Sequence, residues 1–327
     1  MEITDTINTK AMIHKKITSL FILFVLPMFM LTSCYEDYIE DYDTSIAYFS
    51  TQKPLRTVIA DRDMEIKVGI SIGGKRAVNT NDWGRFKIEP ELLDDTSFEL
   101  LPGNYYRLAD PNTFRVSNKN LAIADVAISF TDEFFADEKA ADAYYALPFR
   151  LTESSLDSIN VGSFDPLGNE LLPAKDYSIV VIKFISNYHG TYYVKGKVDE
   201  LDGSGNVVNT VTYNNSDLSR NITRDVRTLS VNTLLRPGLA NMVVGNKEGV
   251  QITVNPDGNS EKVYPVTVET PQGYTALTET SGTYYGNKDK PEIALKYKYK
   301  KGGKTYSVEE TLVLRQDPLE DLRFEEW

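Results

Sequence analysis

Residues 15–34 constrain the chain most, because they decide which part of it remains to fold. Lys15 and Lys16 precede an apolar run over residues 17–30, and small residues follow it. A helix over this run is too short to span the ~30 Å hydrocarbon core of a membrane comfortably. A basic head, a short apolar middle and small residues at the end are typical of a secretory signal peptide, which is removed from the mature protein.

The segment ends in Leu31-Thr32-Ser33-Cys34, which resembles the lipobox of bacterial lipoproteins. The resemblance implies that residues 1–33 are a lipoprotein signal peptide and that the Cys34 thiol receives a diacylglycerol. Two acyl chains anchor a protein stably, since each buried CH₂ group contributes about 0.8 kcal/mol. The alternative is a buried helix that happens to end in a cysteine. Because the chain has 1 cysteine, no disulfide and no thiol for catalysis or metal binding is left.

An acidic tether, residues 34–45, follows the lipidation site. Its acidic run, residues 35–43, resembles the surface-export signal of Bacteroidetes lipoproteins, which implies a lipid-anchored protein of the outer membrane facing the cell exterior. The alternative is a plain solvated linker, because a block of like charges repels itself and stays in water.

The charge balance excludes one class of partner. The 327-residue chain carries a net charge of −12, and removal of the signal peptide also removes Lys10, Lys15 and Lys16. Nucleic acid is therefore not an expected partner, because phosphate binding needs a basic surface.

Short strands with turns between them predict an all-β protein. Residues 64–72 alternate apolar and polar side chains with a period of two, which is typical of a half-buried strand. Residues 177–184 form the most apolar strand of the mature chain, whereas Pro148 suggests an edge position for residues 146–151. A short helix is expected from residue 132 to about residue 143. Two hairpins are expected in the second half, over residues 191–213 and 292–315.

The first mature domain resembles the DUF1735 domain of Bacteroidetes surface lipoproteins. The match lies in the acidic tether, Ala47-Tyr48-Phe49, residues 64–72, residues 145–151 and Asp157-Ser158-Ile159. The resemblance implies an Ig-like β-sandwich over residues 46–186. Residues 187–327 resemble the lipocalin-like domains that often follow it, DUF4361 among them, which implies an antiparallel β-barrel or sandwich. The two resemblances together imply a cell-surface lipoprotein that captures a polysaccharide or other glycan for a SusC/SusD-like transport complex.

Catalytic motifs are absent from the sequence. His189 is the histidine that remains after signal removal, and no Gly-x-Ser-x-Gly or His-Glu-x-x-His motif accompanies it. We therefore expect no enzyme, no metal and no cofactor, with His189 as a packing or hinge residue. A glycosidase with an unrecognised pair of carboxylates remains an alternative. Residues 202–206 and 255–259 fit either calcium loops or metal-free hairpin turns.

Aromatic side chains in polar loops are the candidate ligand-binding residues, because sugars stack on exposed rings while polar groups bind their hydroxyls. Trp327 at the chain end also fits an aromatic that docks back onto its own domain. A structural or adhesive surface protein without sugar binding is the alternative function. The candidate glycan-binding residues are Trp83, Tyr105, Tyr285 and Trp327.

Overall fold

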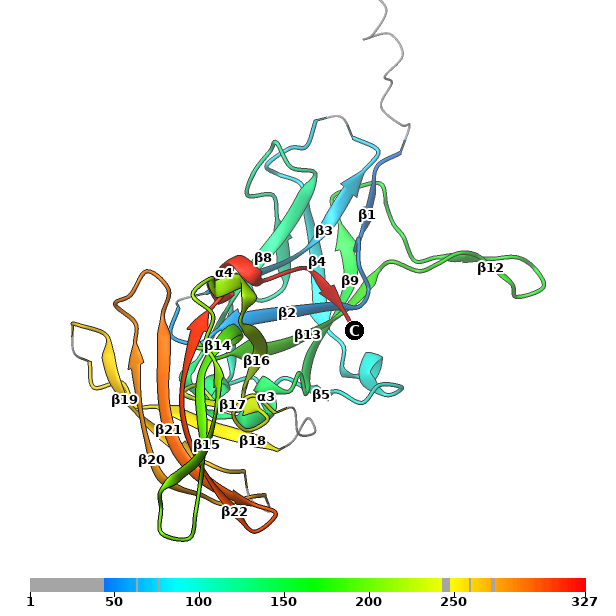
Figure 1. The fold of residues 1–327 in the computed structure, drawn as a ribbon. Coiled ribbons are helices and arrows are strands. Elements are labelled where there is room, and N and C mark those ends of the chain that lie inside the picture. The colour runs from blue at the N-terminus through cyan, green and yellow to red at the C-terminus, as the bar shows by residue number, and fades with distance from the viewer. Residues whose placement is uncertain (1–43, 63, 76, 243–247, 259, 272–273) are drawn as a thin grey trace, which may run out of the picture.

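The computed structural model describes residues 44–327, except residues 63, 76, 243–247, 259 and 272–273. The predicted signal peptide and Cys34 lie outside the described residues, as does nearly all of the acidic tether. The described residues form a sheet-built N-terminal unit and a C-terminal barrel (Figure 1). The predicted all-β class, with a barrel in the second half, is confirmed.

The N-terminal unit is a sandwich of two strand layers linked through β7. The strands run in the order β10-β1-β3-β8-β7-β4-β9-β13-β2-β23, with β6 beside β8 and β5 beside β9. Their bounds are β1 Ile46–Tyr48, β2 Pro54–Ile59, β3 Ile66–Gly73, β4 Trp83–Ile88, β5 Glu99–Leu100, β6 Tyr106–Leu108, β7 Thr113–Arg115, β8 Ile123–Phe130, β9 Tyr145–Ser154, β10 Ser158–Ile159, β13 Tyr177–Ile185 and β23 Glu325–Glu326.

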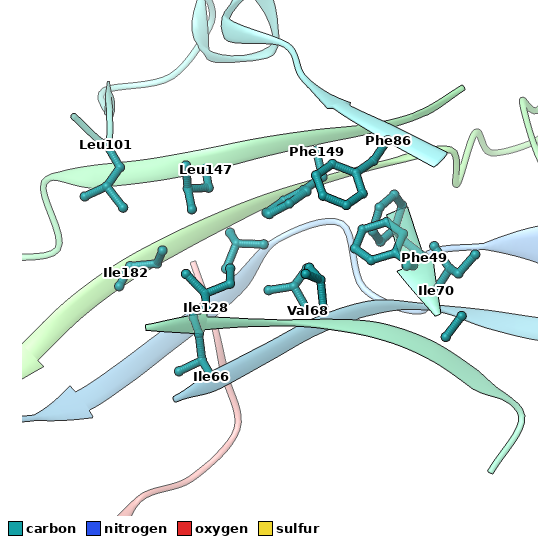
Figure 2. Packing of buried hydrophobic residues seen from close by; sticks show 14 of the residues in the cluster. Phe49, Ile66, Val68, Ile70, Phe86, Leu101, Ile128, Leu147, Phe149 and Ile182 are labelled. Carbon is teal, nitrogen blue, oxygen red and sulfur yellow. The ribbon is translucent and has the colours of Figure 1, made fainter. Parts of the chain in front are cut away.

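The sandwich core follows from the period-two pattern seen in the sequence. Along β3 the side chains of Ile66, Val68 and Ile70 are buried, while the residues between them face outward or are half-buried. Figure 2 shows these side chains directed toward those of the opposite layer, among them Phe149 and Ile182. The alternation predicted for residues 64–72 is thus the inner face of one layer.

Pro148 does not mark an edge strand, contrary to the sequence expectation. β9 is an interior strand that pairs with both β4 and β13. The Pro148 carbonyl accepts the Glu89 N–H at 2.9 Å, just beyond the end of β4. Since a residue's N–H and C=O point to the same side of an antiparallel strand, the donor that proline lacks falls in the gap between β4 and β5, where the ladder does not need it.

The expected helix over residues 132–143 is two short helices instead, α2 Asp132–Ala136 and α3 Glu138–Ala141. The break is at Asp137, whose backbone is extended and whose carboxylate accepts the Lys139 N–H and the Tyr145 hydroxyl. No helix among the described residues is long and apolar enough to cross a membrane. The other short helices are η1 Pro90–Leu93, η2 Leu218–Arg220 and α4 Pro318–Asp321.

A separate two-stranded hairpin, β11 Ser163–Phe164 and β12 Glu170–Leu172, projects from the sandwich (Figure 1). Its turn is held by Asp165, whose carboxylate accepts the backbone N–H groups of Leu167 and Asn169. Exposed apolar side chains cover this hairpin, so it contributes little to the core.

Eight strands of the described chain close into a barrel. They follow the order β14-β16-β17-β18-β19-β20-β21-β22, and β22 pairs back onto β14, while β15 extends one edge of β14. The two hairpins expected from the sequence are β14–β15 and β21–β22. The bounds are β14 Gly190–Leu201, β15 Val207–Tyr213, β16 Ile222–Thr228, β17 Thr233–Pro237, β18 Gly249–Val254, β19 Val263–Glu269, β20 Leu277–Tyr285, β21 Glu292–Lys301 and β22 Lys304–Leu314.

A buried ion pair crosses the barrel interior. Arg236 on β17 donates from Nη2 to Glu310 Oε2 on β22 at 2.9 Å, and both side chains are 0% exposed. The Tyr297 hydroxyl donates to Glu310 Oε1 at 3.0 Å, and Arg236 also donates to the Gly238 carbonyl at 2.6 Å. Because a buried charge is costly unless it is paired and hydrogen-bonded, these contacts fix which way β17 and β22 face.

The two units are fastened to each other by Arg62 and by the returning end of the chain. Arg62, just after β2, donates to both carboxylate oxygens of Asp317 at 2.7 and 2.9 Å, and to Asn187 Oδ1 at 2.7 Å. This hydrogen bonding lowers the pKa of Asp317. Beyond Asp317, β23 returns to pair with β2, so the end of the chain adds a strand to the sandwich. The domain boundary expected at residue 187 assigns β23 to the second domain, so it does not predict this pairing with β2.

Gly196 provides a test of barrel closure. Its β14 position faces β22 so closely that a Cβ atom would lie 2.3 Å from the Glu309 carbonyl oxygen. We expect Gly196→Ala to lower the free energy of unfolding by about 2 kcal/mol, because the strands must separate to admit the methyl group. Urea unfolding followed by circular dichroism measures the change.

The matched control is Gly203→Ala, at the tip of the β14–β15 hairpin. A Cβ atom there meets nothing within 4 Å, so a change within ~0.5 kcal/mol is expected. Equal effects of the two substitutions would contradict the close β14–β22 contact.

Candidate functional site

A groove on the outer face of the barrel crosses four neighbouring strands, β14, β22, β21 and β20. Its floor is a row of register partners that starts at Lys195 and continues through Thr311, Ala294 and Thr283. These side chains alternate with buried ones such as Leu295, so they point out of the barrel. The small residues of the floor leave a hollow of about 530 Å³. We call this hollow the barrel groove; it is lined by Lys195, Lys197, Ser281, Thr283, Tyr285, Ala294, Lys296, Glu309 and Thr311 among others.

Charged side chains form one wall of the barrel groove. Lys197, Glu309, Lys296 and Ser281 are register partners in the row beside the floor. Lys296 Nζ lies 3.1 Å from Glu309 Oε1. On the other side, Lys197 donates to Asp199 at 2.9 Å, and this hydrogen bond raises the pKa of Lys197.

Tyr285 stands on the opposite wall, at the end of β20. It is half-buried, it pairs in register with Glu292, and the Lys288 ammonium lies 4.8 Å from its ring centroid. Lys288 in turn forms an ion pair with Glu292. The aromatic wall is therefore held in place by a charged neighbour.

A second hollow of about 540 Å³ adjoins the barrel groove and shares Lys195 with it. Its lining is polar and includes Asn215, Asn287, Lys288 and Lys290. The two hollows together offer ammonium, amide, hydroxyl and carboxylate groups beside one aromatic ring. Such a set can bind the hydroxyls and one apolar face of a sugar.

The four predicted aromatic residues do not converge on one site. Tyr285 borders the barrel groove, while Trp83 and Tyr105 belong to the sandwich and Trp327 docks against it.

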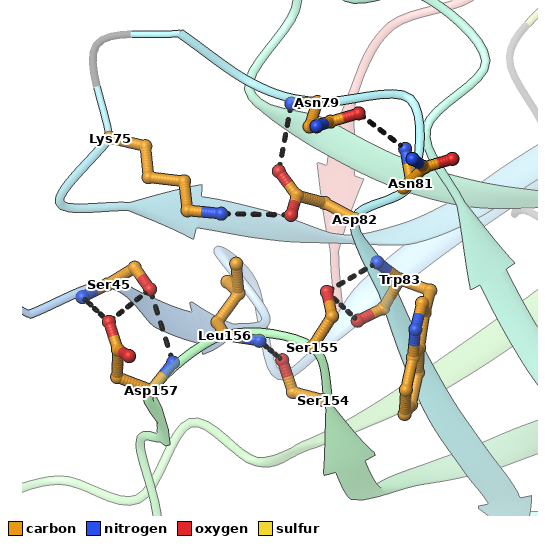
Figure 3. A network of polar contacts seen from close by, with 10 residues as sticks. All are labelled: Ser45, Lys75, Asn79, Asn81, Asp82, Trp83, Ser154, Ser155, Leu156 and Asp157. Atoms are coloured by element: carbon orange, nitrogen blue, oxygen red, sulfur yellow. Dashed lines mark hydrogen bonds and ion pairs between the residues drawn. The ribbon is translucent and has the colours of Figure 1, made fainter.

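Trp83 begins β4 and lies in a network of polar contacts (Figure 3). Its backbone N–H donates to the Ser155 hydroxyl at 2.9 Å, and its carbonyl accepts the Ser155 N–H at 3.1 Å. The Arg85 guanidinium lies 5.4 Å from the Trp83 ring centroid. Neighbouring Asp82 is buried, accepts the Asn79 N–H and pairs with Lys75. The loop that precedes Trp83 is thus held by hydrogen bonds and an ion pair within the protein.

Tyr105 packs into the sandwich core instead of standing in an open loop. Its ring makes edge contacts with Phe134 and Tyr145, and its hydroxyl donates to Asp137 at 3.1 Å. These contacts use both its apolar ring and its polar tip.

Trp327 docks onto the N-terminal sandwich, not onto the barrel that precedes it. Its indole N–H donates to the Ile179 carbonyl at 2.9 Å, and its ring meets Phe98 edge-on. The Lys53 ammonium lies 4.8 Å from the ring centroid. The terminal tryptophan therefore has a structural environment.

His189 lies at the junction between β13 and β14. Its Nδ1 accepts the Thr228 N–H at 3.3 Å and lies 3.1 Å from the Thr228 hydroxyl oxygen. Burial lowers the pKa of His189, and the nearby Lys183 lowers it further. These contacts place His189 in the packing of the junction.

The suspected calcium loop at residues 202–206 is a self-bonded turn. Asp202 accepts the backbone N–H groups of Ser204 and Asn206 and the Asn206 side-chain amide. Within the part of the chain that the structure describes, no group of three or more histidine, cysteine or acidic residues is placed to hold a metal ion. Part of the second suspected loop, Asn259, lies outside that part.

Sequence reasoning missed the lysines and the small floor residues of the barrel groove. Lys195 and Lys197 alternate along β14, and Glu309 and Thr311 alternate along β22. The alternation is readable, but the register that sets the two strands side by side is not, because they are the first and last strands of the barrel.

The sandwich, the closed barrel and the junction between them define a two-domain, all-β class of protein. A family model for an N-terminal domain matches residues 42–158, and one for a C-terminal domain matches residues 176–313. The chain belongs to the two-domain Bacteroidetes family identified from the sequence.

The chain is similar to solved structures to differing degrees, and the first of those described here shares its fold. A Bacteroides ovatus protein of unknown function, solved at 2.40 Å, has a TM-score of 0.68 at 20% identity over 88% of this chain and 98% of its own. A second Bacteroides ovatus protein of unknown function has a TM-score of 0.42 at 12% identity, over 82% and 90% of the two chains. EndoBT-3987 of Bacteroides thetaiotamicron, solved with a Man5GlcNAc product, has a TM-score of 0.28 at 21% identity, over 40% of this chain and 28% of its own. The comparison with curated proteins gave no match.

We expect Trp327→Ala to lower the free energy of unfolding by about 2 kcal/mol, because it removes a packed ring and the hydrogen bond to Ile179. Phe324→Ala is the control from the same tail, since Phe324 is 58% exposed. Thermal melts compare the two. A larger loss from Phe324→Ala would contradict the docking of Trp327.

The pH dependence of stability tests the junction. His189 has a lowered pKa in the folded protein, so below its ordinary value of 6.5 the unfolded chain binds more protons. Its neutral form therefore stabilises the fold above pH 6.5, and this stability is lost as pH falls. We expect the melting temperature to drop less between pH 7.5 and 5.0 in His189→Asn than in the wild type. An equal drop in both would contradict a buried neutral His189.

Proposed function

We propose that the protein is a glycan-binding surface lipoprotein whose sugar site is the barrel groove. The observation that carries the proposal is that Tyr285 borders a hollow lined by hydroxyl, ammonium and carboxylate groups. The rings of Tyr105 and Trp327 are engaged in packing contacts, and Trp83 lines neither of the two hollows. Tyr285 is therefore the best placed of the predicted aromatics to accept a sugar ring.

The dimensions of the barrel groove favour an oligosaccharide. Its floor crosses four strands, from Lys195 on β14 to Thr283 on β20. Neighbouring strands lie about 4.8 Å apart, so the floor is about 14 Å long and has room for about two or three sugar rings. Thr311 and Thr283 offer hydroxyls along it, and Ala294 leaves space for a ring.

Lipid attachment at Cys34 and display on the cell exterior are part of the proposal, supported by the lipobox and the acidic run. β1, where the described chain begins, lies on the side of the sandwich away from the barrel (Figure 1). A chain anchored at Cys34 would hold the barrel groove away from the membrane. Delivery of the bound glycan to a SusC/SusD-like transporter is the role this arrangement suits.

We propose binding without catalysis. The His189 ring accepts a hydrogen bond from Thr228, and the carboxylate of Glu309 in the barrel groove is paired with Lys296. Incubation with the glycans that bind should release no shorter sugars. Product release would favour the glycosidase alternative.

Affinity electrophoresis through gels that contain plant and host glycans tests the site. We expect at least one glycan to retard the protein, and Tyr285→Ala to weaken that binding about fivefold, because a stacked ring contributes about 1 kcal/mol. The control is Tyr274→Ala, an exposed tyrosine outside the barrel groove. Retardation by no glycan, or an equal loss in both variants, would contradict the proposal and would favour an adhesive or structural role.

A further inference from the structure

We infer that the barrel groove selects an anionic glycan, one whose sugars carry carboxylate or sulfate groups. The inference rests on the proposed function and specifies its ligand class. Its central observation is Lys195, which lines both hollows at the point where they meet. Among the described residues, Lys195 has no carboxylate within ion-pair distance.

The other lysines around the two hollows have partners within the protein. Lys197, Lys296 and Lys288 each pair with a carboxylate, whereas Lys290 donates to the Arg315 carbonyl at 2.9 Å. Lys290 therefore keeps a positive charge that no described carboxylate neutralises. Lys195 and Lys290 leave two ammonium groups for a ligand.

The balance of charge around the hollows is opposite to that of the whole chain. Lysine side chains outnumber the carboxylates that line the hollows with them, Asp289, Glu292 and Glu309, even when Asp199, the partner of Lys197, is counted too. The remaining carboxylate, Glu310, faces the barrel interior and is neutralised by Arg236. The chain as a whole carries a net charge of −12. A positive site on a strongly negative protein is not a consequence of its average composition.

The placement of Lys195 and Tyr285 sets how such a glycan would lie. The two residues stand on the outermost strands of the barrel groove, β14 and β20. A sugar ring against Tyr285 and an anionic group at Lys195 are then separated by about three strand spacings, or about 14 Å. The ligand must be an oligosaccharide, with its charge on a different sugar from the one that stacks.

The net charge of the protein argues against nonspecific attraction of polyanions. Beyond the Debye length of about 10 Å at 0.1 M salt, the repulsion is screened and local charges dominate. Binding of an anionic glycan should therefore weaken as salt rises, because it depends on ammonium groups within the barrel groove.

Affinity electrophoresis and titration calorimetry provide the test, with pairs of polymers that share a backbone and differ in charge. The probes are polygalacturonate against its methyl ester for carboxylate, and dextran sulfate against dextran for sulfate. We expect at least one charged polymer to bind more tightly than its neutral partner, and 0.5 M salt to weaken that binding. Lys195→Met should weaken it about fivefold, as expected for the loss of one charged contact.

The matched control is Lys300→Met, which removes the same charge from an exposed lysine of β21 outside both hollows. Its affinity should stay within about twofold of the wild type. Tighter binding of the neutral polymers, lost in Tyr285→Ala but not in Lys195→Met, would overturn the inference and leave the proposed function in place. Binding of neither kind of polymer would overturn the inference, and the proposed function would fall with it only if no plant or host glycan retards the protein. Equal losses in Lys195→Met and Lys300→Met would assign the charge effect to the whole surface and overturn the inference.

Discussion

The pairing of β14 with β22 is the contact on which the rest of the barrel depends. The two strands stay in register from Tyr192 opposite Leu314 to Leu201 opposite Thr305. Without this seam the barrel would be an open sheet with two unpaired edges, which is a liability in water. Gly196 allows the backbones to approach. The same pairing sets Lys195 beside Thr311 and Lys197 beside Glu309. The contact that closes the barrel therefore also forms the barrel groove.

Alternation along β22 couples the barrel interior to its outer surface. Glu310 faces inward to Arg236, while Glu309 and Thr311 face the barrel groove. A slip of one residue would turn Glu310 outward and bury Glu309, because strand side chains alternate with a period of two. The buried side chains of Val308 and Leu312 would leave the core in either direction of slip, and in one direction Thr311 would replace Glu310 beside Arg236. The apolar alternation and the buried ion pair together specify the register that builds the groove.

Local patterns predicted the elements well, and long-range register limited the rest. The alternation of residues 64–72 gave β3, and the apolar run of residues 177–184 gave β13. Pro148 misled because its missing donor falls in a gap between two neighbouring strands, which only the tertiary structure reveals. Tyr285 was a candidate from its polar neighbourhood alone. Lys195 was not, because its role depends on strands more than a hundred residues apart in the chain that the barrel brings together.

A crystal structure of the protein with the oligosaccharide that it binds most tightly tests the central claim most directly. We predict a sugar ring against Tyr285, further sugars across the floor formed by Thr311 and Ala294, and a charged group at Lys195. Sugar bound instead at Trp83 or at the junction beside His189, with the barrel groove empty, would contradict it.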